Sequence, residues 1–181
     1  MIPMGYMAKR VSPPPGYIAA PGLIDVYSVS SCVNDDFAEF IDFWKHNGYW
    51  FFDRPEIIDE LSRANSVDLT DTKLFYYEAY EFEYTGREWR SFSPWIGCPG
   101  VSVVPPSDSD LEGFDVVTFW PENSSQPLHS PLSCNSLAEE IPTNSHCLLR
   151  SFDEAKSALE EGKFAKGEPG PWRIFAVYSV A

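Results

Sequence analysis

The segment that most constrains the fold runs from Thr72 to Trp95, because it has the pattern of two β-strands joined by a short turn. Its first part is TKLFYYEAYEFEY, the turn falls at Thr85-Gly86, and its second part is REWRSFSPW. Aromatic residues favour strands, and a glycine between two such runs favours a hairpin. The hairpin predicts a sheet that contains antiparallel strands.

The register of this hairpin depends on the length of its turn. A two-residue turn gives three cross-strand pairs, which are Phe82 with Trp89, Glu81 with Arg90, and Glu83 with Glu88. A bulge at Gly86 shifts these pairs. The last pair sets two like charges opposite each other, which costs stability.

Two amphipathic helices are expected before the hairpin. The first, residues 35–46, begins after Asn34 and ends at Asn47-Gly48. At 100° per residue its apolar face carries Phe37, Phe40, Ile41 and Trp44. The opposite face carries Asp35, Glu39, Asp42 and His46, and Phe43 lies on the flank. The second helix begins at Asp53, with Glu56 in a capping-box position, and runs to Ala64.

The remaining pattern predicts strands at 23–33, 114–120, 146–152 and 172–180. A helix capped by Ser151 or Asp153 is expected to run to about Glu161, and 121–145 to form a long loop with one helical turn. The order of elements indicates a single α+β domain, residues 22–181, with a mainly antiparallel sheet and amphipathic helices packed on one face. Residues 1–21 contain five prolines and are expected to form a flexible N-terminal arm.

Charge excludes several classes of partner. The chain has 27 acidic and 13 basic residues, for a formal net charge of −14. Such a chain repels phosphate backbones and anionic lipid, so direct binding to nucleic acid or to a membrane is not expected. No apolar stretch approaches the roughly 18 residues of a membrane span. These features favour a cytoplasmic protein with a basic partner.

The sequence carries no recognisable catalytic or metal motif. The histidines are His46, His129 and His146, and none has the spacing of a metal or nucleophile motif. Cys32, Cys98, Cys134 and Cys147 show no C-x-x-C pattern, so reduced, mostly buried thiols are expected, with no disulfide framework, metal or cofactor.

Paired carboxylates leave a small carboxylate-using enzyme open as an alternative. Its pocket would lie at the aromatic segment 49–53, with Asp53 or Glu78 as the acid. A structural accessory subunit is a third possibility.

The acidic residues are concentrated between positions 34 and 84, where thirteen acids and four bases give a charge of −9. Aromatic residues interleave them, and aromatic anchors surrounded by charge are typical of binding surfaces. We therefore expect a partner-binding surface made of Asp35, Glu39, Asp42, Phe43, His46, Glu78, Glu81 and Glu83.

Two stretches, DDFAEFIDFWKHNGYWFFDRPEII and SFDEAKSALEEGKFAKGEPGPWRIFAVYSV, resemble the immunity proteins that bacteria make against their own polymorphic toxins. The helix that ends in Asn47-Gly48 is similar to one in the Smi1/Knr4-like immunity superfamily. The resemblance implies a non-enzymatic protein that neutralises a cognate toxin by binding it. Many such toxins are basic nucleases, which an acidic inhibitor would meet quickly through electrostatic steering.

Overall fold

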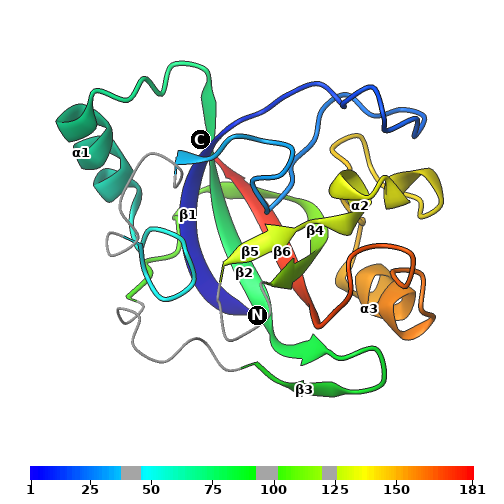
Figure 1. Ribbon diagram of the computed structural model, residues 1–181. Helices are drawn as coiled ribbons and strands as arrows, with labels where there is room; N and C mark the ends of the chain where they lie inside the picture. The colour runs from blue at the N-terminus through cyan, green and yellow to red at the C-terminus, as the bar shows by residue number, and fades with distance from the viewer. Residues whose placement is uncertain (38–45, 93–101, 120–125) are drawn as a thin grey trace.

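The structure is a computed structural model that describes residues 1–37, 46–92, 102–119 and 126–181 (Figure 1). An antiparallel sheet has the strand order β1-β2-β6-β4-β5, and β3 pairs with β2. The strands are β1 (Ile2–Arg10), β2 (Thr72–Tyr84), β3 (Trp89–Ser91), β4 (Ser109–Phe119), β5 (Pro127–His129) and β6 (Trp172–Val180). The helices are α1 (Pro55–Asn65), α2 (Pro131–Cys134), the 3₁₀ helix η3 (Leu137–Glu139) and α3 (Phe152–Glu160). The expected α+β class is confirmed.

Several expected elements are confirmed at close to their expected bounds. Strands β2 and β6 begin and end where the sequence predicted, and α1 and α3 match the two helices expected near 53–64 and 151–161. Ser151 caps α3 by accepting a hydrogen bond from the Glu154 amide at 3.2 Å. Residue 54, not Asp53, is the N-cap of α1, and its side chain makes no capping bond.

The expected N-terminal arm is wrong in its first half, because Ile2–Arg10 forms strand β1. Met4, Tyr6, Met7 and Ala8 are all buried there, and the strand pairs with β2 along its length. Four of the five prolines follow the strand. The proline content of residues 1–21 as a whole therefore suggested an arm, although the prolines are concentrated after an apolar strand.

The expected strands at 23–33 and 146–152 are also wrong. The two segments run beside each other, with the Tyr27 amide donating to the His146 carbonyl at 3.0 Å, but they form no regular ladder. Side chains occupy many of the backbone groups that a ladder would need. Lys9, for example, donates to three successive carbonyls in the first segment.

The hairpin register differs from the two-residue turn. Glu83 pairs with Arg90 and Tyr84 with Trp89, which leaves a four-residue connection from Thr85 to Glu88. The connection closes through a hydrogen bond from the Thr85 amide to the Glu88 carbonyl at 3.0 Å. The like-charge pair of Glu83 and Glu88 is therefore avoided.

The chain contains two copies of one structural unit, which its sequence does not reveal. In the first, β1 pairs with β2 through a bulge at Gly5; in the second, β4 pairs with β6 through a bulge at Gly113. Gly5 lies opposite Tyr77, Tyr77 opposite Val177, and Val177 opposite Gly113. An approximate two-fold axis therefore passes through the pair of Tyr77 and Val177 at the centre of the sheet.

The bulge in each unit is held by an equivalent segment that precedes a helix. Tyr6 exchanges two backbone hydrogen bonds with Phe52, and Phe114 does the same with Leu149, at 2.8–3.0 Å. Trp50 and Cys147, at matching positions, both have positive φ, 67° and 63°. The matching stretches, NGYWFFDRPEII and NSHCLLRSFDEA, share only their first Asn.

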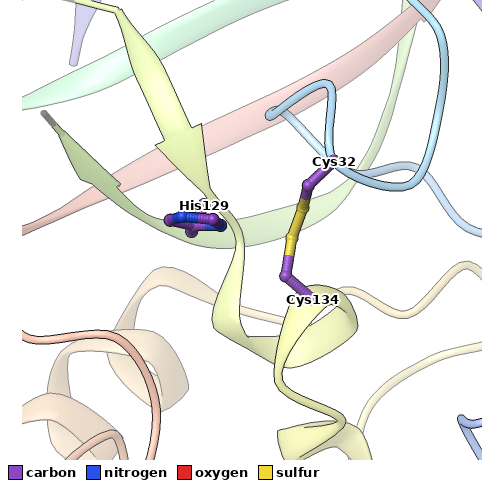
Figure 2. A group of neighbouring side chains, drawn as sticks. All are labelled: Cys32, His129 and Cys134. Atoms are coloured by element: carbon purple, nitrogen blue, oxygen red, sulfur yellow. A yellow bond between two sulfur atoms is a disulfide. The ribbon is translucent and has the colours of Figure 1, made fainter.

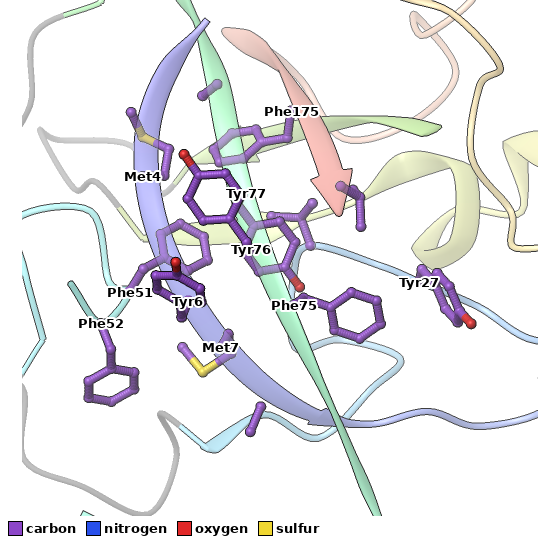
Figure 3. Close-up of a cluster of buried hydrophobic side chains, with 14 of the residues drawn as sticks. Met4, Tyr6, Met7, Tyr27, Phe51, Phe52, Phe75, Tyr76, Tyr77 and Phe175 are labelled. Carbon is purple, nitrogen blue, oxygen red and sulfur yellow. The ribbon is translucent and has the colours of Figure 1, made fainter. Parts of the chain in front are cut away.

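Strand β6 is buried on both faces and separates two core clusters. Phe175 and Val177 belong to the first cluster, while Ile174 and Ala176 belong to the second. Figure 3 shows the first cluster, in which Phe51 packs on Tyr77 with ring centroids 5.0 Å apart. Helix α1 packs beside β1, and α3 packs beside β4 and β6 (Figure 1).

Candidate functional site

The first half of the expected binding surface falls mostly outside the described residues. Glu39, Asp42 and Phe43 lie there, as does Trp44. Asp35 is exposed, as expected. His46 is only 2% exposed, and its assignment to the acidic face is wrong. Its ring packs against Trp50 and Phe52, with centroid distances of 5.2 and 5.1 Å, so the aromatic joint covers it.

The three acids of β2 differ in their surroundings. Glu81 is exposed, as expected. Glu78 is half-buried and accepts hydrogen bonds from the hydroxyls of Tyr76, at 3.2 Å, and Tyr178, at 3.4 Å. Burial first, and then the charge of Glu78, raise the pKa of Tyr76 well above its usual value. Glu83 is buried and pairs with Arg90 at 2.6 Å, so its expected place on an open acidic surface is wrong.

The expected proximity of Asp35 to the far end of β2 is also wrong. The Asp35 carbonyl accepts from the Arg10 amide at 3.0 Å, and Arg10 pairs with Thr72 at the start of β2. Glu81 lies nine residues further along the strand, about 30 Å at 3.3 Å per residue. Asp35 and Glu81 therefore do not form one compact surface.

A different group of exposed acids lies around α1, and we call it the acidic ridge. Helix α1 exposes its acids to solvent, and the loop after it adds two more. Asp68 and Asp35 line the same small hollow beside Arg10. Hydrogen bonds from the Thr70 side chain and amide lower the pKa of Asp68, which keeps it charged. The acidic ridge consists of Asp35, Glu56, Asp59, Glu60, Asp68 and Asp71.

The aromatic joint at 49–53 is a packing seam with a small cavity. Phe51 and Phe52 are 2% and 1% exposed. The cavity beside Trp50 and Phe51 has a volume of about 110 Å³, well below the roughly 300–1,000 Å³ of small-molecule sites. Asp53 accepts from Asn47 Nδ2 at 2.9 Å and from the Ser102 amide at 3.0 Å. Its carboxylate thus holds neighbouring chain segments in place.

A polar cluster around His146 was not predicted from the sequence. The His146 ring stacks on Tyr27 at 4.2 Å, its Nδ1 contacts the Asp25 carboxylate, and its Nε2 lies 3.9 Å from Glu112. Ser179 Oγ bonds to Glu112 at 2.6 Å. A nucleophilic triad needs the serine against the imidazole, and here it bonds to a carboxylate instead. Since its members come from four distant segments, no local motif could have indicated the cluster.

A buried polar group fixes the loop 28–30. Lys9, 1% exposed, donates to the carbonyls of Ser28, Val29 and Ser30 at 2.7–2.8 Å. The Val29 amide donates to Asp115 at 2.9 Å. Burial raises the pKa of Asp115 to about 6, against hydrogen bonds and the charge of Lys9, which lower it. Two charged side chains on different strands of the sheet therefore bind one loop, Lys9 through its carbonyls and Asp115 through the Val29 amide.

The cysteines contradict one expectation and confirm another. Cys32 and Cys134 form a disulfide, which the sequence pattern did not predict, whereas Cys147 is a free, buried thiol as expected. Cys98 lies outside the described residues. His129 lies beside the disulfide (Figure 2), and these three side chains could hold a metal ion.

Comparison with known protein families, curated proteins and solved structures finds no match for this chain. None of the helices in the described ranges has both the length and the apolar character that a membrane crossing requires. Any functional assignment therefore depends on the residues themselves.

Proposed function

We propose that this protein is a non-enzymatic, cytoplasmic inhibitor of the immunity-protein class, which binds a basic protein toxin such as a nuclease. The observation that carries the proposal is the acidic ridge. Residues 54–71 contain five of its carboxylates and only two basic residues, Arg54 and Arg63, and all seven side chains are exposed. Asp35 and Asp68 line one small hollow together with Arg10, so Asp35 adds a carboxylate beside the loop after α1.

The ridge suits a docking surface because three of its six acids lie on α1, a helix beside the edge strand β1. Of the residues of α1, only Ile58 is fully buried, so the charged side of the helix can meet a partner without disturbing the core. Charge of one sign on one face raises association rates by about 10–10³. The proposed binding surface is still acidic, as expected, but it contains residues of α1 and the loop after it in place of Glu83 and His46.

The alternative, a carboxylate-using enzyme at segment 49–53, has less support. Asp53 is tied to Asn47 and Ser102, Glu78 is tied to two tyrosine hydroxyls, and the neighbouring cavity has room for only a few water molecules. We therefore do not propose an enzymatic function for Asp53 or Glu78.

The test begins with a search for a toxin domain in the reading frames beside the gene, and any such domain is co-expressed with this protein. We expect co-expression to protect the host cell, and we expect the double variant Asp59→Lys/Glu60→Lys to associate more slowly, with the largest loss at low salt. The control is Glu160→Lys/Glu161→Lys, which makes the same charge change at the C-terminal end of α3, away from the ridge; its folding is checked separately, because Glu160 accepts a hydrogen bond from Trp89 Nε1 at 2.8 Å. If both doubles protect equally and share one salt slope, the ridge only solubilises the protein.

A further inference from the structure

Three metal-ligating side chains from two distant parts of the chain meet beside β5 (Figure 2). Cys32 follows the loop 28–30, which Lys9 and Asp115 bind. His129 is the last residue of β5, and Cys134 is the last residue of α2. One ligand atom from each lies within 4.8 Å of the others. Cys32 is exposed and the other two are half-buried, so the group opens to solvent.

We propose that Cys32, Cys134 and His129 bind one divalent ion of the zinc class when the two cysteines are reduced, with water in the fourth position. Two thiolates and an imidazole form a ligand set that zinc prefers, and a site with three protein ligands leaves one position open. The proposal does not depend on the toxin-binding function.

The geometry allows the disulfide and the metal site at the same position. The two Cα atoms are 6.3 Å apart, within the range of about 4.4–6.8 Å for disulfides. Zn–S bonds of about 2.3 Å at tetrahedral angles need sulfur atoms about 3.8 Å apart, and a Zn–N bond of about 2.0 Å places the nitrogen about 3.5 Å from each sulfur. Since the ligand atoms already lie within 4.8 Å, side-chain rotations suffice.

Hydrogen-bond donors already surround the two sulfur atoms. Ser30 Oγ lies 3.0 Å from Cys32 Sγ and 3.5 Å from Cys134 Sγ, and the Ser130 amide donates to Cys134 Sγ at 3.4 Å. Such donors stabilise the negative charge of metal-bound thiolates and orient them. A disulfide, which carries no charge, gains less from them.

The two cysteine-bearing segments are held together without the disulfide. The Ser30 amide donates to Ser130 Oγ at 3.2 Å, and Lys9 and Asp115 fix the loop from the sheet side. The ligands should therefore stay close after reduction, so that little ordering entropy opposes metal binding.

The oxidised and metal-bound forms exclude each other. A dithiol or phosphine reductant transfers two electrons to the disulfide, and the sulfur atoms take up two protons. Binding of the ion to the two thiols then releases two protons and forms two metal–sulfur bonds. In the disulfide form neither sulfur is available as a thiolate, so metal binding reports the redox state of this pair.

The test uses purified, phosphine-reduced full-length protein, kept free of oxygen and titrated with Co²⁺ and then Zn²⁺. We expect one cobalt per chain with sulfur-to-cobalt charge-transfer absorbance, which zinc abolishes, and no such band in the oxidised protein. Cys32→Ser, Cys134→Ser and His129→Ala should each weaken binding by at least about 100-fold, and Ser30→Ala by about 10-fold. Cys147→Ser and His146→Asn, which alter a thiol and an imidazole outside the group, should bind normally.

A readout on the unmutated protein guards against variants that fail to fold. Zinc should protect Cys32 and Cys134 of the reduced chain from alkylation, as mapped by peptide mass, and leave the alkylation of Cys147 unchanged. Reduced protein that shows no charge-transfer band, or zinc that protects neither cysteine, would overturn the proposal.

Discussion

Asn47 and Asn144 make the same three side-chain hydrogen bonds in the two halves of the molecule. Each Nδ2 donates to the carbonyl of a bulged residue, Met4 at 2.8 Å and Glu112 at 2.7 Å. Each Oδ1 accepts two backbone amides, those two and four residues later in the chain, at 2.9–3.2 Å. The side chain therefore ties the bulge to the segment that leads into the helix.

We expect Asn47→Ala and Asn144→Ala each to lower the free energy of unfolding by about 2–4 kcal/mol, because a buried group that loses its partner costs about 1–3 kcal/mol. Strands β1 and β4 are separated by two strands, about 14 Å, so the losses should add. Urea unfolding measures the effect. Asn65→Ala, at an exposed position in α1, is the control, and a loss equal to that of the control would contradict the tethering role.

The glycine at each bulge should tolerate no side chain. Gly5 has φ +130°, and a Cβ there would lie 2.5 Å from the Phe52 carbonyl oxygen and 2.8 Å from Phe51 Cβ. Gly5→Ala should cost at least about 2 kcal/mol through strain and overpacking. Gly16→Ala, with open space around the added atom, should change stability by less than about 0.5 kcal/mol. Thermal unfolding of both variants decides the point; similar losses would mean that the bulge relaxes.

The sequence indicated the elements whose signals are local. Strands β2 and β6 and helices α1 and α3 follow from aromatic runs, amphipathic spacing and the Ser151 cap. Strand β1 was missed because its nine residues carry Pro3 and Gly5, which weaken a strand signal, and only pairing with β2 shows that they belong in the sheet. The two-fold relation between the units was missed because it is carried by hydrogen bonds of Asn47 and Asn144, with almost no shared sequence.

The acidic surface could be predicted less well than the fold, because tertiary packing decides which acids are exposed to solvent. Alternation in β2 could not show that Glu83 meets Arg90, because the length of the turn sets that register. Helical spacing placed His46 outside, whereas the aromatic joint that follows covers it. The disulfide links residues 102 positions apart, and no spacing rule identifies such a pair.

Asp115 should make stability depend on pH in a direction unusual for an acid. Its pKa is raised from 3.8 to about 6, so the folded state holds a proton that the unfolded state releases. The contribution is fully present below about pH 3.8 and is lost as the pH rises through 6, about 3 kcal/mol in total. In Asp115→Asn, the free energy of unfolding should no longer fall over this pH range. Urea unfolding from pH 4 to 7 gives the difference between the two proteins, and parallel curves would contradict the raised pKa.

The disulfide should stabilise the oxidised protein. Because Cys32 and Cys134 lie 102 residues apart, the bond restricts a large part of the unfolded chain, and its loss should cost about 2–5 kcal/mol. The comparison is between oxidised and phosphine-reduced protein, both with a chelator so that no metal offsets the loss. Cys32→Ser should then unfold like the reduced protein and should not respond to reductant. An equal response in the variant would assign the effect to another thiol.

Lys9 should stabilise the fold through the loop that it grips. Lys9→Met leaves the carbonyls of Ser28, Val29 and Ser30 without their ammonium partner, and it removes the cation beside Asp36, 4.0 Å away. Breaking a buried ion pair on one side costs about 3–5 kcal/mol. Hydrogen exchange should quicken at the Val29 and Ser30 amides, while Val177 at the centre of the sheet stays protected. Lys156→Met, in a surface pair with Glu160, should cost less than about 1 kcal/mol. If the two substitutions cost the same, the loop is held by Asp115 and Ser130 alone.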